Sequence, residues 1–331
     1  MYSDTRVLLV GEFDDQLHAH ASLRRRALER LGCRVVSFNL SRSGGWLSRL
    51  RHVGLQDRLA SALGHSTPAM VLVLEGTQID APMVAWLKKA IPSTWVNWFC
   101  DARRSGQEIR PYAASYDAVF VGDSATADFL EAPGNPPVYY LAPGCDPSVH
   151  RPMRARDRFR ANVVFVGTAT PHRERMLCEL MAYGLAVWGP GWRKTRLRDY
   201  CRGELLQHED YVRAYAGASV AINIPCVEAS HSGVDRRLFE LAAIGVPQVV
   251  EDGPDLHQYF REGSEVLVAR GTVDLRSLTA EALHDRAWAE QVGAGARQRA
   301  LTEHTYMHRM WALLETLGTA PLLTSWAPAT S

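Results

Sequence analysis

The feature that most limits how this chain can fold is a regular alternation of short apolar runs with helical segments. The runs form two series, separated by a polar, proline-bearing and arginine-rich stretch over 143–161. The predicted strands are 6–11, 33–40, 69–76, 94–100, 116–122 and 137–143, then 162–167, 185–189, 219–225, 247–250 and 265–269. Apolar strands that alternate with helices are typical of parallel sheets covered on both faces. The sequence therefore predicts an α/β protein with two doubly wound, Rossmann-like domains.

The predicted domains are 1–152 and 153–304, and the segment 305–331 begins with a strong helical pattern. Further helices are expected at 21–32, 81–91, 172–184 and 208–218, with another from Arg236 to the glycine at 245. The segment 44–64 interleaves apolar residues with arginines. It is expected to be an amphipathic helix that covers the sheet, although an acceptor-facing or membrane-surface element is an alternative.

Composition excludes several classes of protein. The 331 residues carry a net charge of +1, which gives no electrostatic reason to expect a nucleic-acid partner. The six cysteines form no CxxC pair, so a reducing compartment is favoured over a disulfide framework or a zinc ribbon. The N-terminus lacks the pattern of a signal peptide, and no apolar run approaches the roughly 20 residues of a membrane span. A cytoplasmic protein without stable membrane insertion is expected.

Glu240 is the most unusual residue of the second series. Apolar residues surround it from Leu238 to Ile244, and Gly245 and Pro247 then end the helix. Burying a carboxylate is unfavourable unless hydrogen bonds compensate for the lost water. The partner of Glu240 is therefore expected to be either another part of the protein or a ligand.

Two strand-to-helix junctions contain glycine. Gly11 ends the first strand of the first series, and Gly167 with Thr168 follows the first strand of the second, with Arg173 close behind. Glycine lets backbone amides approach a ligand, and the following helix N-terminus favours anions. Each junction alone is more often a tight turn, but the pair together with Arg173 favours a bound pyrophosphate.

Candidate acid–base groups are few. Asp101 directly follows an apolar strand, where ligands bind in doubly wound sheets, although an N-cap or an ion pair with a neighbouring arginine is an equal alternative. His18 and His20 lie before the first helix and are candidate bases. The spacing of acidic pairs does not match a D-x-D metal–diphosphate site, so no metal is predicted. A hydrolase elbow and a dinucleotide fingerprint are also missing.

In this order, the motifs resemble those of the GT-B glycosyltransferases, specifically the CgeB-like (spore maturation protein) branch related to the family 4 enzymes. In the first half the resemblance rests on "VLVLEGTQIDAPMVAWLKK", "VNWFCDARR", "YDAVFVGDS" and "VYYLAPGCDPSVHRP". In the second half it rests on "NVVFVGTATPHRERML", "LAVWGPGW", "YAGASVAINIP", "GVDRRLFELAAIGVPQVVED" and "HTYMHR".

The resemblance implies two domains that face a cleft, with a C-terminal helix that crosses back to pack on the first domain. A nucleotide diphosphate sugar would bind mainly to the second domain and an acceptor to the first, without a metal or other cofactor. Glu240 would then accept hydrogen bonds from the ribose. Arg173 would bind the diphosphate beside Gly167 and Thr168, Gly11 would lie near the diphosphate, and Asp101 would face the donor sugar.

One departure from the family pattern concerns the E-x7-E motif. Its first Glu would fall at Ser232, which cannot supply the carboxylate that contacts the transferred sugar. The backbone amides near Gly233 are expected to contact the diphosphate. Arg237, one helical turn before Glu240, is expected to pair with that carboxylate or with a phosphate.

Two functions of different classes follow. The first is a metal-independent, retaining hexosyltransferase that acts on a hydroxyl of a natural product, glycan or lipid. If the enzyme inverts, the base is Asp101, His18 or His20. The second is a non-catalytic scaffold that binds a nucleotide sugar, or an epimerase or hydrolase on the same fold. Recognition of the nucleotide base is expected near 205–209.

Overall fold

The chain folds into two compact units. The computed structural model describes residues 5–13, 20–40, 67–100, 104–204, 206, 209–226 and 233–319. The first unit combines Met1–Pro143 with Tyr306–Ser331, and the second unit is Gly144–Thr305. Both ends of the chain therefore belong to one unit, whereas the other unit is continuous. The predicted helix over 44–64 lies outside the described residues.

The first unit is built on a parallel sheet of six strands in the order β2-β1-β3-β4-β5-β6. The strands are β1 (Arg6–Gly11), β2 (Arg34–Asn39), β3 (Met70–Leu74), β4 (Thr94–Phe99), β5 (Ala118–Val121) and β6 (Val138–Tyr140). The helices are α1 (His20–Arg30), α3 (Ala81–Ala90), α4 (Gly106–Ala113), α5 (Ser124–Leu130) and α11 (Tyr306–Thr316). The strand order reverses between β1 and β3, so the crevice outside their carboxyl ends is where ligands bind in such sheets.

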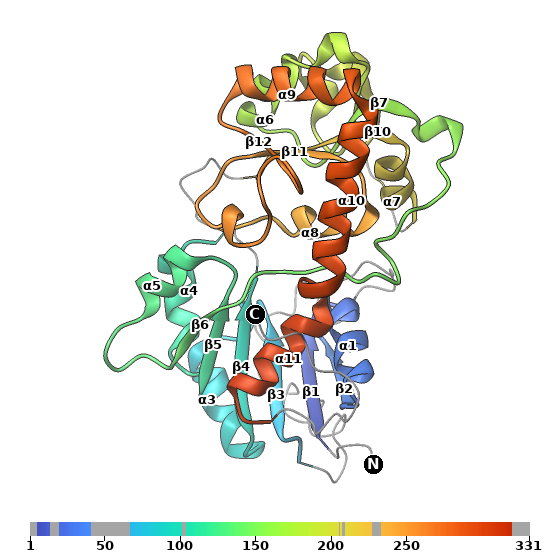
Figure 1. Cartoon of the computed structure of the whole chain (residues 1–331). Coiled ribbons are helices and arrows are strands. Elements are labelled where there is room, and N and C mark those ends of the chain that lie inside the picture. Colours follow the sequence, from blue (N-terminus) through green and yellow to red (C-terminus); the bar gives the residue numbers. More distant parts are fainter. Residues whose placement is uncertain are drawn as a thin grey trace. The chain divides into compact units, whose positions relative to one another are not determined.

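Alternate residues of these strands point to opposite faces of the sheet. On one face, side chains such as Val71 and Val119 pack in one core with Leu87 of α3 and Ile109 of α4. The other face carries Trp98, which packs edge-on against Tyr306 of α11. Figure 1 shows α11 beside α1, across the strands of this sheet. Both faces are thus covered, which explains why the strands are almost entirely apolar.

Two arginines fix α11 to the first unit. Arg24 of α1 is fully buried, with its guanidinium carbon 4.4 Å from the ring centroid of Trp98 and 4.7 Å from that of Tyr306. Arg309 donates from Nε to the carbonyl oxygens of Ala142 and Pro143, both at 3.0 Å. The last helix therefore completes the core of the unit that the first residues of the chain begin.

The second unit is built on another parallel sheet of six strands, in the order β12-β11-β10-β7-β8-β9. The strands are β7 (Ala161–Val166), β8 (Leu185–Trp188), β9 (Cys201–Gly203), β10 (Ala218–Asn223), β11 (Gln248–Glu251) and β12 (Leu267–Ala269). The helices are α6 (Pro171–Cys178), α7 (Glu209–Ala216), α8 (Arg236–Ile244), α9 (Thr272–His284) and α10 (Arg286–Glu303). Counted from β7, this is the 3-2-1-4-5-6 order of a Rossmann sheet, whose switch point lies between β7 and β10.

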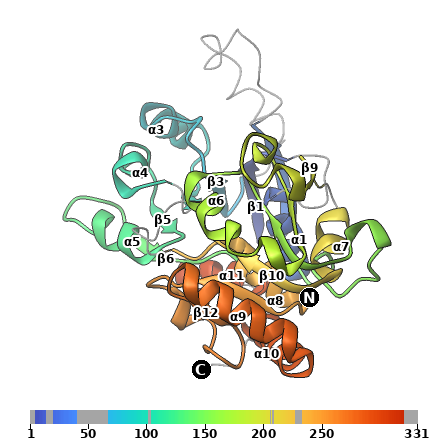
Figure 2. The ribbon, with the colours of Figure 1, turned by 90° about the horizontal axis from the view of Figure 1, so that it is seen from above.

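Successive residues of β7 show how this sheet is covered. Phe165 packs in a core with α6, α9 and α10, whereas Val164 packs on the opposite face with Tyr215 of α7 and Leu241 of α8. Helices α9 and α10 contact each other and, as Figures 1 and 2 show, meet at a steep angle. At the two ends of this unit, Cys145 and Thr305 form a parallel bridge.

The predicted fold class, an α/β protein with two doubly wound parallel sheets, is confirmed. Among the described residues, helices α4, α5, α9 and α10 and the short strand β9 were missing from the sequence-based assignment. The predicted helix 172–184 is too long, because α6 ends at Cys178 and a separate 3₁₀ turn follows at Met181–Tyr183. Gly184, with a φ of 70°, then leads into β8.

Candidate functional site

At the switch point of the second sheet, the side chain of Arg173 hydrogen-bonds to the backbone that follows β7 and β10. Its Nε and Nη2 donate to the carbonyl oxygen of Ile224 at 3.1 and 2.8 Å, and Nη1 donates to that of Thr168 at 3.0 Å. Ile224 follows β10 and Thr168 follows β7, so one guanidinium joins the backbone beyond the two strands. Arg173 is only 2% exposed. Most of its hydrogen-bonding capacity therefore holds these two segments together.

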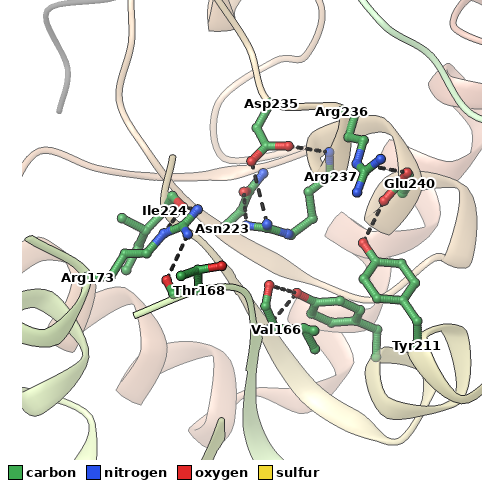
Figure 3. A network of polar contacts seen from close by, with 11 residues as sticks. Val166, Thr168, Arg173, Tyr211, Asn223, Ile224, Asp235, Arg236, Arg237 and Glu240 are labelled. Atoms are coloured by element: carbon green, nitrogen blue, oxygen red, sulfur yellow. Dashed lines mark hydrogen bonds and ion pairs between the residues drawn. The ribbon is translucent and has the colours of Figure 1, made fainter. Parts of the chain in front are cut away.

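A second guanidinium, that of Arg237, lies close by (Figure 3). Arg173 and Arg237 both lie over the ring of Phe165, with guanidinium carbons 5.2 and 5.5 Å from its centroid. Arg237 Nη2 is 3.6 Å from Asp235 Oδ2, and its Nη1 donates to Asn223 Oδ1 at 3.5 Å. Asp235 also caps α8, because its carboxylate accepts from the Arg237 backbone N–H at 3.0 Å.

The electrostatics of this pair favour an anion. Burial lowers the pKa of Arg173, and the positive charge of Arg237 lowers it further. Burial acts in the same direction on Arg237, but the carboxylate of Asp235 outweighs it and raises the pKa of that guanidinium. Burial would raise the pKa of Asp235, and Arg237 instead holds it below its ordinary value. Among the described residues, the Asp235 carboxylate therefore balances the charge of one of these two guanidiniums, which leaves positive charge at the switch point.

Glu240, on α8, is 4% exposed, and its carboxylate lies near three side chains of the described residues. The Tyr211 hydroxyl donates to Oε2 at 2.6 Å. His150 Nε2 and Arg236 Nε both lie 3.7 Å from Oε1. Of the two partners expected for Arg237, a carboxylate of Glu240 or a phosphate, the first is wrong: Arg236 is the arginine beside Glu240, whereas the guanidinium of Arg237 lies beside Asp235 and Asn223.

These partners keep Glu240 charged. Burial alone would raise the pKa of Glu240, but Arg236, His150 and the Tyr211 hydroxyl together hold it below its ordinary value. Burial and the negative charge of Glu240 raise the pKa of Tyr211 well above its usual range, so this hydroxyl remains a donor. A buried, ionised carboxylate with partners on both oxygens is a strong acceptor for ligand hydroxyls.

The structure brings Gly167, Thr168, Arg173, Arg237 and Glu240 into the second unit, at or beside the switch point. A Cβ at Gly167 would be in tight contact with the Phe165 ring at 3.1 Å and with Arg173 Nη1 at 3.2 Å, so a larger residue there would require these side chains to shift.

The other predicted site residues are placed less fully. Gly233 precedes the cap of α8. Gly11 ends β1 in the first unit, where a Cβ would lie 3.3 Å from that of Ala21. His20 begins α1. Asp101, His18 and Ser232, together with most of the predicted base-recognition segment 205–209, lie outside the described residues.

Sequence reasoning missed His150, Tyr211, Arg236 and Asn223. The spacing of Arg236 and Glu240 was a usable signal, because i, i+4 pairs of opposite charge are neighbours on a helix. Tyr211 and His150 approach Glu240 from α7 and from the segment before β7, and no local pattern marks them.

In the part of the chain that the structure describes, no group of three or more His, Cys, Asp or Glu side chains could hold a metal ion. No described helix is long and apolar enough to cross a membrane.

Comparison with known proteins finds one matching family model and several solved structures with the same fold. Residues 172–315, which include Arg173, Arg237 and Glu240, match the family model described as glycosyl transferase-like. Sucrose-phosphate synthase from Thermosynechococcus elongatus superposes with a TM-score of 0.68 over 96% of this chain and 100% of its own, at 13% identity. The chain has the GT-B fold.

Two further GT-B structures support this assignment. Anabaena HepE in complex with UDP-glucose has a TM-score of 0.65 over 95% of this chain and 99% of its own, at 11% identity. A trehalose-phosphate synthase from Burkholderia xenovorans has a TM-score of 0.58 over 96% and 100%, at 13% identity. A search of curated proteins finds no significant match to this GT-B chain.

Proposed function

We propose that this protein is a glycosyltransferase that transfers a hexose from a nucleoside diphosphate sugar to a hydroxyl group. The observation that carries the proposal is the position of Arg173, Arg237 and Glu240. All three lie in the segment 172–315 that matches the glycosyl transferase-like family, and all three are at or beside the switch point of the second sheet. HepE, which shares the fold, binds UDP-glucose.

In this proposal the donor binds to the second unit. The charged carboxylate of Glu240 accepts hydrogen bonds from the ribose hydroxyls. Arg237 attracts the diphosphate, aided by amides near Thr168 and Gly233 and by the N-terminus of α6. Arg173 holds the two segments that frame this space and adds to its positive charge.

The acceptor is proposed to bind to the first unit and to be a natural product, a glycan or a lipid. Positive charge at the switch point stabilises the departing diphosphate without a metal. With retention of configuration, the leaving phosphate takes the acceptor proton. With inversion, Asp101, His18 or His20 takes it. The CgeB-like assignment and a cytoplasmic location remain predictions.

A second candidate function is a scaffold that binds a nucleotide sugar without transfer, or an epimerase or hydrolase on the same fold. Ser232 favours it, because the resemblance places a sugar-contacting glutamate at this position. The two candidates differ in turnover rather than in donor binding.

The test is a melting-temperature screen with UDP, GDP, CDP, ADP and dTDP and their sugars, followed by assays for transfer and for sugar release. We expect one nucleotide base to stabilise the protein selectively, because a ligand that binds only the folded state raises its stability. Transfer to a hydroxyl acceptor would support the first function. Stabilisation without any turnover would support the scaffold, and no stabilisation by any nucleotide would contradict both.

Chelation tests the metal-free mechanism separately. We expect EDTA to leave transfer unchanged, since guanidiniums and helix N-termini neutralise the leaving group. The control compares EDTA with EDTA saturated with calcium. Loss of activity with free EDTA and recovery on adding Mg²⁺ or Mn²⁺ would show that a metal is required.

A further inference from the structure

We propose that His150 is a positioning residue for Glu240, and that this contact sets a preference for ribonucleotides over 2′-deoxyribonucleotides. The inference rests on the proposed function, because it takes Glu240 to be the ribose acceptor. His150 belongs to the segment that precedes the second sheet. This residue lies outside the range 172–315 that matches the family model.

The segment that carries His150 is a tight turn closed by its own hydrogen bonds. The carbonyl oxygen of Asp146 accepts from the backbone N–H groups of Val149 at 3.0 Å and His150 at 2.8 Å. The Asp146 side chain accepts from the backbone N–H and the hydroxyl of Ser148, at 2.9 and 2.7 Å. Cys145 donates its N–H to the carbonyl oxygen of His304 at 3.0 Å, which ties the turn to the end of α10.

This turn also orients the imidazole of His150. The Asp146 backbone N–H donates to Nδ1 at 3.1 Å, so a neutral ring carries its proton on Nε2. Nε2 is the atom that lies 3.7 Å from Glu240 Oε1. His150 is only 1% exposed, and the ring is therefore held with its N–H on the carboxylate side.

The partners of Glu240 then act on different oxygens. Tyr211 donates to Oε2, while His150 and Arg236 lie near Oε1. A carboxylate has about four lone-pair positions, so each oxygen keeps capacity for a ligand hydroxyl. The hydrogen bond fixes Oε2, and the two cationic or N–H-bearing side chains near Oε1 favour one orientation of the carboxylate before a ligand arrives. Vicinal 2′ and 3′ hydroxyls could each be accepted by one oxygen, whereas a 2′-deoxyribose offers one hydroxyl fewer.

The experiment measures dissociation constants for a nucleoside diphosphate and its 2′-deoxy analogue, with the base that the wild-type protein binds best, such as UDP and 2′-deoxy-UDP. We expect wild type to prefer the ribonucleotide about tenfold or more. His150→Phe removes the imidazole nitrogens that face Asp146 and Glu240, and we expect it to reduce this ratio about threefold to fivefold, because Glu240 loses a polar neighbour at ion-pair distance. His150→Asn, which keeps an acceptor for Asp146 but cannot reach Glu240, should do the same even if the Phe variant folds poorly.

Matched variants separate positioning from general stability. His150→Gln, which extends an N–H towards Glu240, should restore much of the ratio. Thr279→Val removes a different buried polar group of the second unit and should leave the ratio unchanged. In a protein that already carries Glu240→Gln, adding His150→Phe should not reduce the ratio of the two affinities any further.

Three results would overturn the proposal. An unchanged ratio in both His150→Phe and His150→Asn would show that the imidazole does not act on the ribose contact. An additive loss in the double variant would show that it does not act through Glu240. Either result leaves the proposed function intact, whereas a wild-type protein that binds no nucleoside diphosphate would contradict that function as well.

Discussion

Glu240→Gln should weaken the binding of the preferred nucleoside diphosphate about tenfold to a hundredfold. The substitution keeps the shape of the side chain and removes its charge, and a hydrogen bond to a charged group contributes about 1.5–3 kcal/mol. Isothermal titration or a fluorescence titration with the nucleotide measures the change directly. Glu240→Ala should be at least as severe, because it also leaves the Tyr211 hydroxyl without its acceptor.

Glu265→Gln is the matched control for this substitution. Glu265 is another buried carboxylate of the second unit, and it accepts from the Arg261 backbone N–H at 2.8 Å. We expect Glu265→Gln to leave nucleotide affinity unchanged. If Glu240→Gln lowers the melting temperature but not the affinity, the carboxylate is structural and the ribose assignment fails.

The pH dependence of stability provides a second measurement on Glu240→Gln. The pKa of Glu240 is lower in the folded protein than its ordinary value, so ionised Glu240 stabilises the fold above the ordinary pKa of a glutamate. This contribution should disappear as the pH falls through the lowered folded value. The difference in unfolding free energy between wild type and Glu240→Gln should therefore be constant near neutrality and should shrink in acid.

Arg173→Met should lower the free energy of unfolding of the second unit by about 1–3 kcal/mol. It leaves the carbonyl oxygen of the buried residue Ile224 without this donor, and a loss of that kind costs about 1–3 kcal/mol, whereas the carbonyl oxygen of the exposed residue Thr168 can bind water instead. Urea unfolding followed by circular dichroism measures the change. Arg175→Met, an exposed arginine of the same helix, is the control and should change stability by about 0.5 kcal/mol or less.

The same variant distinguishes a structural arginine from one that binds phosphate. If Arg173 acts only by holding the switch point together, Arg173→Met should weaken the binding of a nucleoside and the binding of its diphosphate by similar factors. If its charge also reaches the diphosphate, the substitution should weaken the binding of the nucleoside diphosphate more than that of the nucleoside. Arg173→Lys should then recover part of the lost affinity. A variant as stable as wild type would contradict the role of Arg173 in joining the segments that follow β7 and β10.

The sheets were predictable from the sequence, whereas several helices were not. Buried parallel strands must be apolar on both faces, so segments such as 69–76 and 162–167 stand out from their polar flanks. Helix α10 is rich in alanine, glycine and charged residues, and its apolar side is too weak to identify by periodicity. Its buried residues include Gly293, where a Cβ would lie 2.6 Å from the carbonyl oxygen of Gly245, so close helix packing rather than hydrophobicity places it.

The candidate site shows the same division. Glu240 was identifiable because a charge in an apolar helix requires a partner. The nature of that partner was not, since Tyr211 and His150 come from segments distant in the sequence. Arg173 was predicted as a phosphate ligand from its place after a strand–glycine junction. Only the fold reveals that its guanidinium is already shared between two backbone carbonyls.

The division of the chain also has a consequence for synthesis on the ribosome. Residues 144–305 are inserted between the two parts of the first unit, and their ends meet in the bridge between Cys145 and Thr305. The hydrophobic cores of this unit contain no residue of α11, so they can form from its own continuous segment. The first unit must wait for α11, because Arg24 and Trp98 lack Tyr306 until then. The residues of the first unit that precede Gly144 are therefore made before the second unit, yet their core is completed only when α11 has followed it.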